Sequence, residues 1–99
     1  MLMIPLTKNY NQSFTTSINS HKLAITLRSF RKLIYASVDV DEVNAVNGFR
    51  IVQNAEILPW SFARKIGGNI MFLTNNGQYP YPEDFDNSVC KLVFKAFGE

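Results

Sequence analysis

The chain has 99 residues, of which 46% are hydrophobic and 18% are charged, and its formal net charge at pH 7 is +2. This balance excludes a disordered chain and predicts one globular domain over residues 1–99. The small charge also argues against nucleic acid as the main partner, because nucleic-acid modules usually carry a clustered basic face.

The first half of the chain predicts antiparallel strands. The opening residues, MLMIPLTKNYNQ, have neither the basic start of a signal peptide nor the apolar length of a membrane helix. Apolar and polar residues then alternate in QSFTTSI and HKLAITLRSF, with Leu23, Ile25 and Leu27 on the expected core face. Asn19 and Ser20 between these runs predict a hairpin turn. LIYASVDV is the next predicted strand, after the polar break at Arg31 and Lys32.

Residues 38–48, VDVDEVNAVNG, are dense in oxygen side chains and invite comparison with a calcium-binding loop. An EF-hand loop that began at Asp39 would have Val43, Asn44 and Arg50 at positions that need a ligand, a glycine and a glutamate. The calcium interpretation therefore fails. We expect residues 41–48 to form a polar connection, with Asn47 and Gly48 supplying the turn before a short strand, FRIVQ.

The segment EILPWSFARKIGG is the one place where the sequence favours a helix. Leu58, Phe62 and Ile66 are spaced four residues apart, and Gly67 is suited to ending a helix. Pro59, with no good N-cap before it, leaves a structured loop as the alternative.

Two further strands are predicted at NIMFLT and VCKLVFKAF. The alternation in the last strand places Cys90, Leu92, Phe94 and Ala96 on the core face. Between these strands, Pro80 and Pro82 favour an extended connection. The expected fold is all-β, a small six-stranded antiparallel barrel or sandwich with at most one short helix.

The residue pattern predicts no catalytic, cofactor or metal site, and hence a protein that is not an enzyme. His21 is the only histidine, so the sequence offers no spacing for a zinc site, and it is expected to be a solvated turn residue. Cys90, the only cysteine, is expected to be a buried and unreactive thiol. The carboxylates of residues 83–86 lack a neighbouring acid or base that would tune them for catalysis.

Two sets of side chains are candidates for a binding surface. The first consists of aromatic residues in predicted connections, which are common interface anchors: Trp60, Phe62, Tyr79 and Tyr81. For Trp60 and Phe62, the alternative is that they close the end of the barrel. The second combines cations with aromatics, as surfaces that bind single-stranded nucleic acid do: Arg28, Phe30, Arg31, Lys32 and Tyr35. The alternative for this set is a solvated hairpin tip.

Several short segments, in order along nearly the whole chain, support a family resemblance. They are MIPL, NQSF, YASVDV, GFRIV, ILPWSF, IGGNI and CKLVFKAF. In their order and spacing the chain resembles the small baseplate plug proteins of cyanophage-type contractile tails. It departs from the family pattern at SFRKLI, which has no glycine.

The resemblance implies a non-enzymatic structural subunit of a phage or prophage tail, folded as a compact β-barrel that closes or lines the central hub of the baseplate. The implied partners are other tail or baseplate proteins, namely hub, tube or spike, with a homo-oligomer as a further option. The implied location is the virion tail baseplate, after synthesis in the cytoplasm of the bacterial host, with no cofactor and no membrane contact. The alternative is a small barrel that binds single-stranded nucleic acid through the hairpin of residues 28–35.

Overall fold

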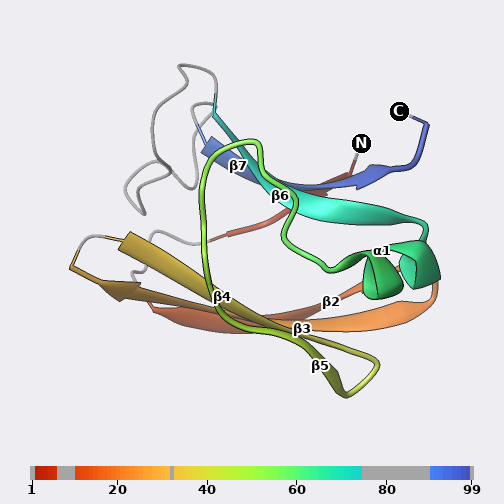
Figure 1. Cartoon of the computed structure of the whole chain (residues 1–99), viewed down its shortest axis with the longest axis horizontal. Helices are drawn as coiled ribbons and strands as arrows, with labels where there is room; N and C mark the ends of the chain where they lie inside the picture. The colour runs from red at the N-terminus through yellow and green to blue at the C-terminus, as the bar shows by residue number, and fades with distance from the viewer. Residues whose placement is uncertain (1, 7–10, 32, 75–89, 99) are drawn as a thin grey trace.

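The structure, a computed structural model, describes residues 2–6, 11–31, 33–74 and 90–98. The elements in chain order are β1 (Leu2–Ile4), β2 (Gln12–Ile18), β3 (His21–Phe30), β4 (Leu33–Val40), β5 (Val43–Arg50), α1 (Trp60–Ile66), β6 (Gly68–Thr74) and β7 (Cys90–Ala96). Strands β2 to β5 form a four-stranded antiparallel sheet in that order, and β1, β7 and β6 form a three-stranded antiparallel sheet. The two sheets lie one above the other, with α1 at one end (Figure 1).

This architecture confirms the all-β prediction with one short helix. Of the two predicted arrangements, the two sheets agree with the sandwich, whereas the barrel and the count of six strands are wrong. The described residues form seven strands in two separate sheets. The additional strand, β1, has only three residues, which is too short for a period of two to be recognised in the sequence. It pairs with β7 through Met3 and Val93, so tertiary pairing fixes it more than local pattern does.

The core lies between the sheets and is built from the alternating residues of both. The predicted core face of β3 is confirmed, because Leu23, Ile25 and Leu27 are buried, as is the matching face of β4. Leu92 and Phe94 of β7 are also buried as expected, and the side chain of Cys90 lies outside the described residues. Val93, expected to face solvent, is buried as well, and it pairs with Met3 and Met71 on the outer face of its sheet.

Two-residue turns with positive φ angles connect β2 to β3 and β4 to β5. Asn19 and Ser20 have φ angles of 51° and 66°, which confirms the predicted first hairpin. Asp41 and Glu42 have φ angles of 51° and 70° and link β4 to β5 in the same way. This turn was not recognised in the sequence because Glu42 stands where such turns usually contain glycine.

The predicted polar connection over residues 41–48 is therefore wrong, because β5 begins at Val43. Asn47 and Gly48 lie inside this strand, where its register against β4 shifts. Gly48 has a φ of 68° and donates its N–H to Ser37 Oγ (3.1 Å), which in turn donates to Asn47 Oδ1 (3.1 Å). Gly48 thus has the positive φ expected of it, but it lies in a β-bulge within β5 and not in a turn.

The predicted helix is confirmed as α1, directly after Pro59. Gly67 ends it in the left-handed conformation, with a φ of 85° and an N–H that donates to Ala63 O (2.9 Å). The expected four-residue spacing places Leu58 and Ile66 in the core. Phe62 is partly buried and packs against the core. The helix therefore closes one end of the space between the sheets.

Candidate interaction surfaces

The outer face of the three-stranded sheet carries an apolar strip. Met3 on β1, Val93 on β7 and Met71 on β6 are directly paired, and Met3 is 61% exposed. The strip continues to Phe97, just after β7, which lines the same hollow as Met71. Phe97 in turn meets Trp60 of α1, with ring centroids 5.4 Å apart. We call these five residues the apolar strip.

Trp60 and Phe97 are the most prominent part of this strip, since they are 65% and 50% exposed. Their contact is held in place from the backbone, because the Phe97 N–H donates to Gly67 O at the end of α1 (3.0 Å). Large aromatic side chains that stand in solvent are costly to hydrate and are common anchors in interfaces. The arrangement therefore suits contact with another protein.

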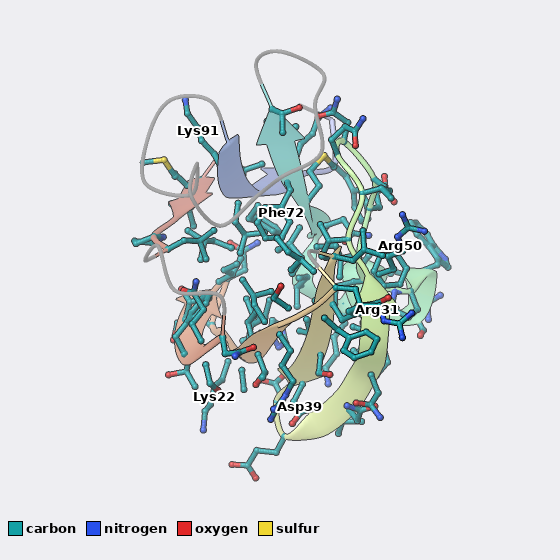
Figure 2. The ribbon with its side chains drawn as sticks, turned by 90° about the vertical axis from the view of Figure 1, so that its left-hand side faces the viewer. Lys22, Arg31, Asp39, Arg50, Phe72 and Lys91 are labelled. Carbon is teal, nitrogen blue, oxygen red and sulfur yellow. The ribbon has the colours of Figure 1, made fainter. Side chains whose placement is uncertain are left out.

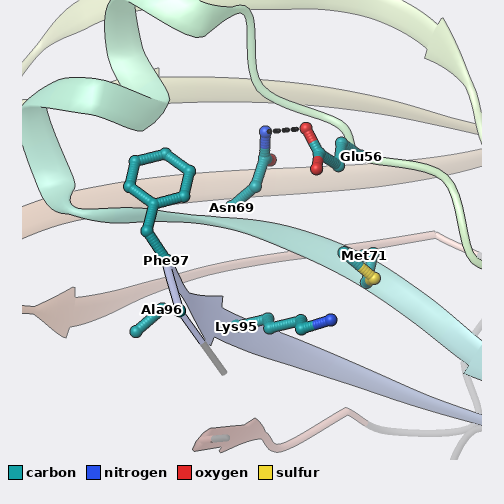
Figure 3. Close-up of a pocket in the computed structure, with 7 residues that line it drawn as sticks. Glu56, Asn69, Met71, Lys95, Ala96 and Phe97 are labelled. Carbon is teal, nitrogen blue, oxygen red and sulfur yellow. Dashed lines mark hydrogen bonds between the residues drawn. The ribbon is translucent and has the colours of Figure 1, made fainter.

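Asn69 fixes the segment that leads into α1. Its side chain is 3% exposed, and its Oδ1 accepts the N–H of Leu58 (2.8 Å) while its Nδ2 donates to Leu58 O (2.9 Å). Nδ2 also donates to Glu56 Oε2 (3.3 Å), the contact drawn in Figure 3. Beside Asn69 lies a hollow of about 200 Å³, lined also by Lys95 and Phe97. The asparagine thus connects the edge of β6 to the helix that presents Trp60.

The four aromatic residues singled out in the sequence have different positions. Trp60 points outward and Phe62 packs against the core, while Tyr79 and Tyr81 lie outside the described residues. The partner of Trp60, Phe97, was missed by the sequence reasoning. A signal was present, because Leu92, Phe94 and Ala96 occupy the core face and the alternation leaves Phe97 on the outer one.

The outer face of the four-stranded sheet carries a row of two arginines with a tyrosine between them. Arg28 on β3 pairs with Tyr35 on β4, which pairs with Arg50 on β5. Directly paired residues share a face, and here it is the face away from the core residues Leu27 and Ala36. We call Arg28, Tyr35 and Arg50 the arginine row.

The other members of the predicted cationic set lie beside this row. Phe30 is 62% exposed, and the guanidinium of Arg31 lies 5.2 Å from the centre of its ring. Figure 2 shows Arg31 and Arg50 on the same side of the molecule. Lys32 lies outside the described residues. Sequence reasoning missed Arg50, because only the β4–β5 register brings it opposite Tyr35.

Asp41, at the opposite end of this sheet, connects two hairpin turns through its carboxylate. Asp41 accepts a hydrogen bond from His21 Nδ1 at Oδ2 (2.6 Å) and one from the Lys22 N–H at Oδ1 (2.9 Å), and Lys65 Nζ is 3.6 Å from Oδ2. These contacts, the His21 hydrogen bond first, hold the pKa of Asp41 below its ordinary value. His21 is thus a paired residue and not the solvated one expected, and it joins the two hairpins.

The neighbouring carboxylate of Asp39 also accepts a hydrogen bond within the hairpin. Asp39 Oδ1 accepts a hydrogen bond from Asn44 Nδ2 (2.9 Å), so its oxygen already faces a donor. No group of three or more His, Cys, Asp or Glu residues that could hold a metal ion occurs in the part of the chain that the structure describes. Across the same residues, no helix has the length and apolar character needed to cross a membrane.

Comparison with known protein families identifies the wider class. The family model described as cyanophage baseplate Pam3 plug gp18 matches residues 1–96. The chain belongs to this family. The match confirms the resemblance found in the sequence and supports a place for this plug-family protein in the phage tail baseplate, where a plug has a structural role. A search of curated proteins gives no match.

Proposed function

We propose that this plug-family protein is a non-enzymatic component of tail assembly, a single domain that closes or lines the central hub of the baseplate. The observation that carries the proposal is the family match, which spans residues 1–96. Its mechanism is occlusion and contact, and its partners are hub, tube or spike proteins or further copies of itself. Like other virion parts, it is made in the bacterial host cytoplasm and then incorporated.

The apolar strip supports this proposal as the surface that contacts a neighbouring protein. Its five residues run from β1 across the sheet to α1, and Met3, Trp60 and Phe97 each expose half or more of their surface. Exposed apolar side chains bordered by a polar rim are typical of protein interfaces. Lys91 and Lys95 of β7 provide part of that rim. Of the four predicted interface residues, Trp60 is the one that belongs to this strip. The interface role of Phe62, Tyr79 and Tyr81 stays a prediction.

The proposal is tested with tail baseplates assembled in cells that lack this chain. Purified chain is added, and its association is measured by co-sedimentation. We expect the native protein to associate and the double variant Trp60→Ser, Phe97→Ser to lose at least about tenfold in affinity, because interface anchors carry most of the binding energy.

The matched control for this experiment is Val43→Ser. Val43 is 53% exposed and lies at the β4–β5 hairpin, away from the apolar strip. Its variant should associate like the native chain. Failure of the native chain to associate with such baseplates would contradict the proposed function. Equal association of the double variant and the control would contradict the role of the apolar strip.

A further inference from the structure

The arginine row is a cationic surface that the family match does not explain. Neighbouring strands lie about 4.8 Å apart, so the Cα atoms of Arg28 and Arg50 are about 10 Å apart, with Tyr35 between them. Both arginines are exposed, and Arg31 extends the charge at the adjoining turn. Three guanidinium groups therefore share one end of the outer sheet face.

These cations have no acidic partner within the described residues. The ion pairs there involve Asp41 with His21 and Lys65, at the other end of the sheet. The part of the face next to Arg28 and Tyr35 carries hydroxyls, since Thr26 pairs with Ser37. Exposed arginines grouped in this way repel one another, and an anionic partner removes that repulsion.

We propose that the arginine row docks an acidic segment of a neighbouring protein in the baseplate. The planar guanidinium groups of Arg28 and Arg50 each match a carboxylate in a two-point hydrogen-bonded pair, and the Tyr35 hydroxyl can donate to a third acceptor. Carboxylates on alternate residues of an extended segment are about 7 Å apart, a spacing that the long arginine side chains can span. Phe30 adds an exposed apolar contact beside the charges. The inference rests on the proposed function and adds a second contact surface, on the sheet opposite the apolar strip.

Two observations favour an acidic protein segment over single-stranded nucleic acid. The cationic stretch is short, about two strand spacings wide, whereas nucleic-acid surfaces follow the phosphate backbone over several nucleotides. Along β4 the same face leads to Asp39, which would repel a phosphate chain running in the strand direction. A short run of carboxylates fits within the width of the arginine row and does not need to extend as far as Asp39.

Binding of two probes tests the inference, with fluorescence anisotropy as the readout. The first probe is a short peptide in which Asp alternates with Ser, and the second is a thymidine oligonucleotide of equal charge. The variant is Arg28→Gln, Arg50→Gln, and the control is Lys22→Gln, an exposed cation on the same face at its other end. We expect the native chain to bind the peptide more tightly than the oligonucleotide, and the arginine variant to lose about tenfold or more. The control should bind like the native chain.

Three results would overturn the inference: no peptide binding by the native chain at low salt, tighter binding of the oligonucleotide, or an equal loss in the Lys22 control. Co-sedimentation of the same variant with baseplates separates this inference from the proposed function. If the native chain fails to associate, the proposed function fails. If native chain and arginine variant associate equally well, only the arginine-row inference fails.

Discussion

Replacing Asn69 with alanine tests how the structure holds the helix that presents Trp60. In the native protein the buried Asn69 amide accepts from the Leu58 N–H and donates to the Leu58 carbonyl, at 2.8 and 2.9 Å. The alanine variant leaves both backbone groups without these partners in a buried region. Since each unsatisfied buried group costs about 1–3 kcal/mol, we expect the free energy of unfolding to fall by about 2–6 kcal/mol. For a domain of this size, that corresponds to a drop in Tm of at least about 10 °C.

The assay is thermal and urea denaturation, followed by circular dichroism and by the fluorescence of Trp60, the only tryptophan in the chain. The matched control is Asn44→Ala, because Asn44 is exposed and its amide also donates two hydrogen bonds, to Asp39 and to the Val46 carbonyl. Water can replace those bonds, so the control should lose less than about 1 kcal/mol. If Asn69→Ala were no less stable than Asn44→Ala, the account of Asn69 would be refuted.

Three further predictions concern packing, pH and calcium. Gly68→Ala should lower the free energy of unfolding by about 3 kcal/mol in a denaturation experiment. The added Cβ would lie 2.4 Å from the Lys95 carbonyl oxygen and force β6 and β7 apart. Unchanged stability would contradict this packing. The pKa of Asp41 is lowered in the folded protein, so its ionised form contributes stability that is lost as pH falls from about 5 through that lowered value. Urea midpoints across this range should fall less steeply for Asp41→Asn, and the reasoning fails if both proteins show the same acid dependence. Calcium should leave Tm unchanged, because Asp39 and Asp41 already accept hydrogen bonds; a clear rise would reveal a site.

Much of the fold could be predicted from local pattern, because a sheet with one buried face imposes a period of two on its strands. This rule located β2, β3, β4 and β7 and the core face of β3, and the spacing of Leu58, Phe62 and Ile66 located α1. These elements share one property: each buries a face that its own sequence displays.

The features that the sequence analysis predicted wrongly, a turn and a connection, depend on pairing between strands. Asn47 and Gly48 carry the composition of a turn, but their positive φ is used in a bulge because β5 continues its pairing with β4. The turn at Asp41 is stabilised instead by His21, a residue from another hairpin. Local preferences cannot distinguish a bulge from a turn when tertiary pairing decides between them.

The candidate surfaces show the same division. Trp60 could be selected from the sequence as an aromatic residue in a predicted connection, but its contact with Phe97 joins elements that are far apart in the chain. Arg28 and Tyr35 could be grouped because they flank one hairpin, whereas Arg50 enters the row only through the β4–β5 register. Composition therefore indicated the kinds of residue, and the sheet register determined which of them act together.

The central claim, that the chain is a plug in the baseplate hub, is tested most directly by electron cryo-microscopy of intact tails. Tails from cells that produce the native chain are compared with tails from cells that lack it. The account predicts density for a domain of two packed sheets on the tail axis within the baseplate hub, and its absence when the chain is missing. Complete tails that lack the chain at the hub, or that carry it only on their outer surface, would contradict the account.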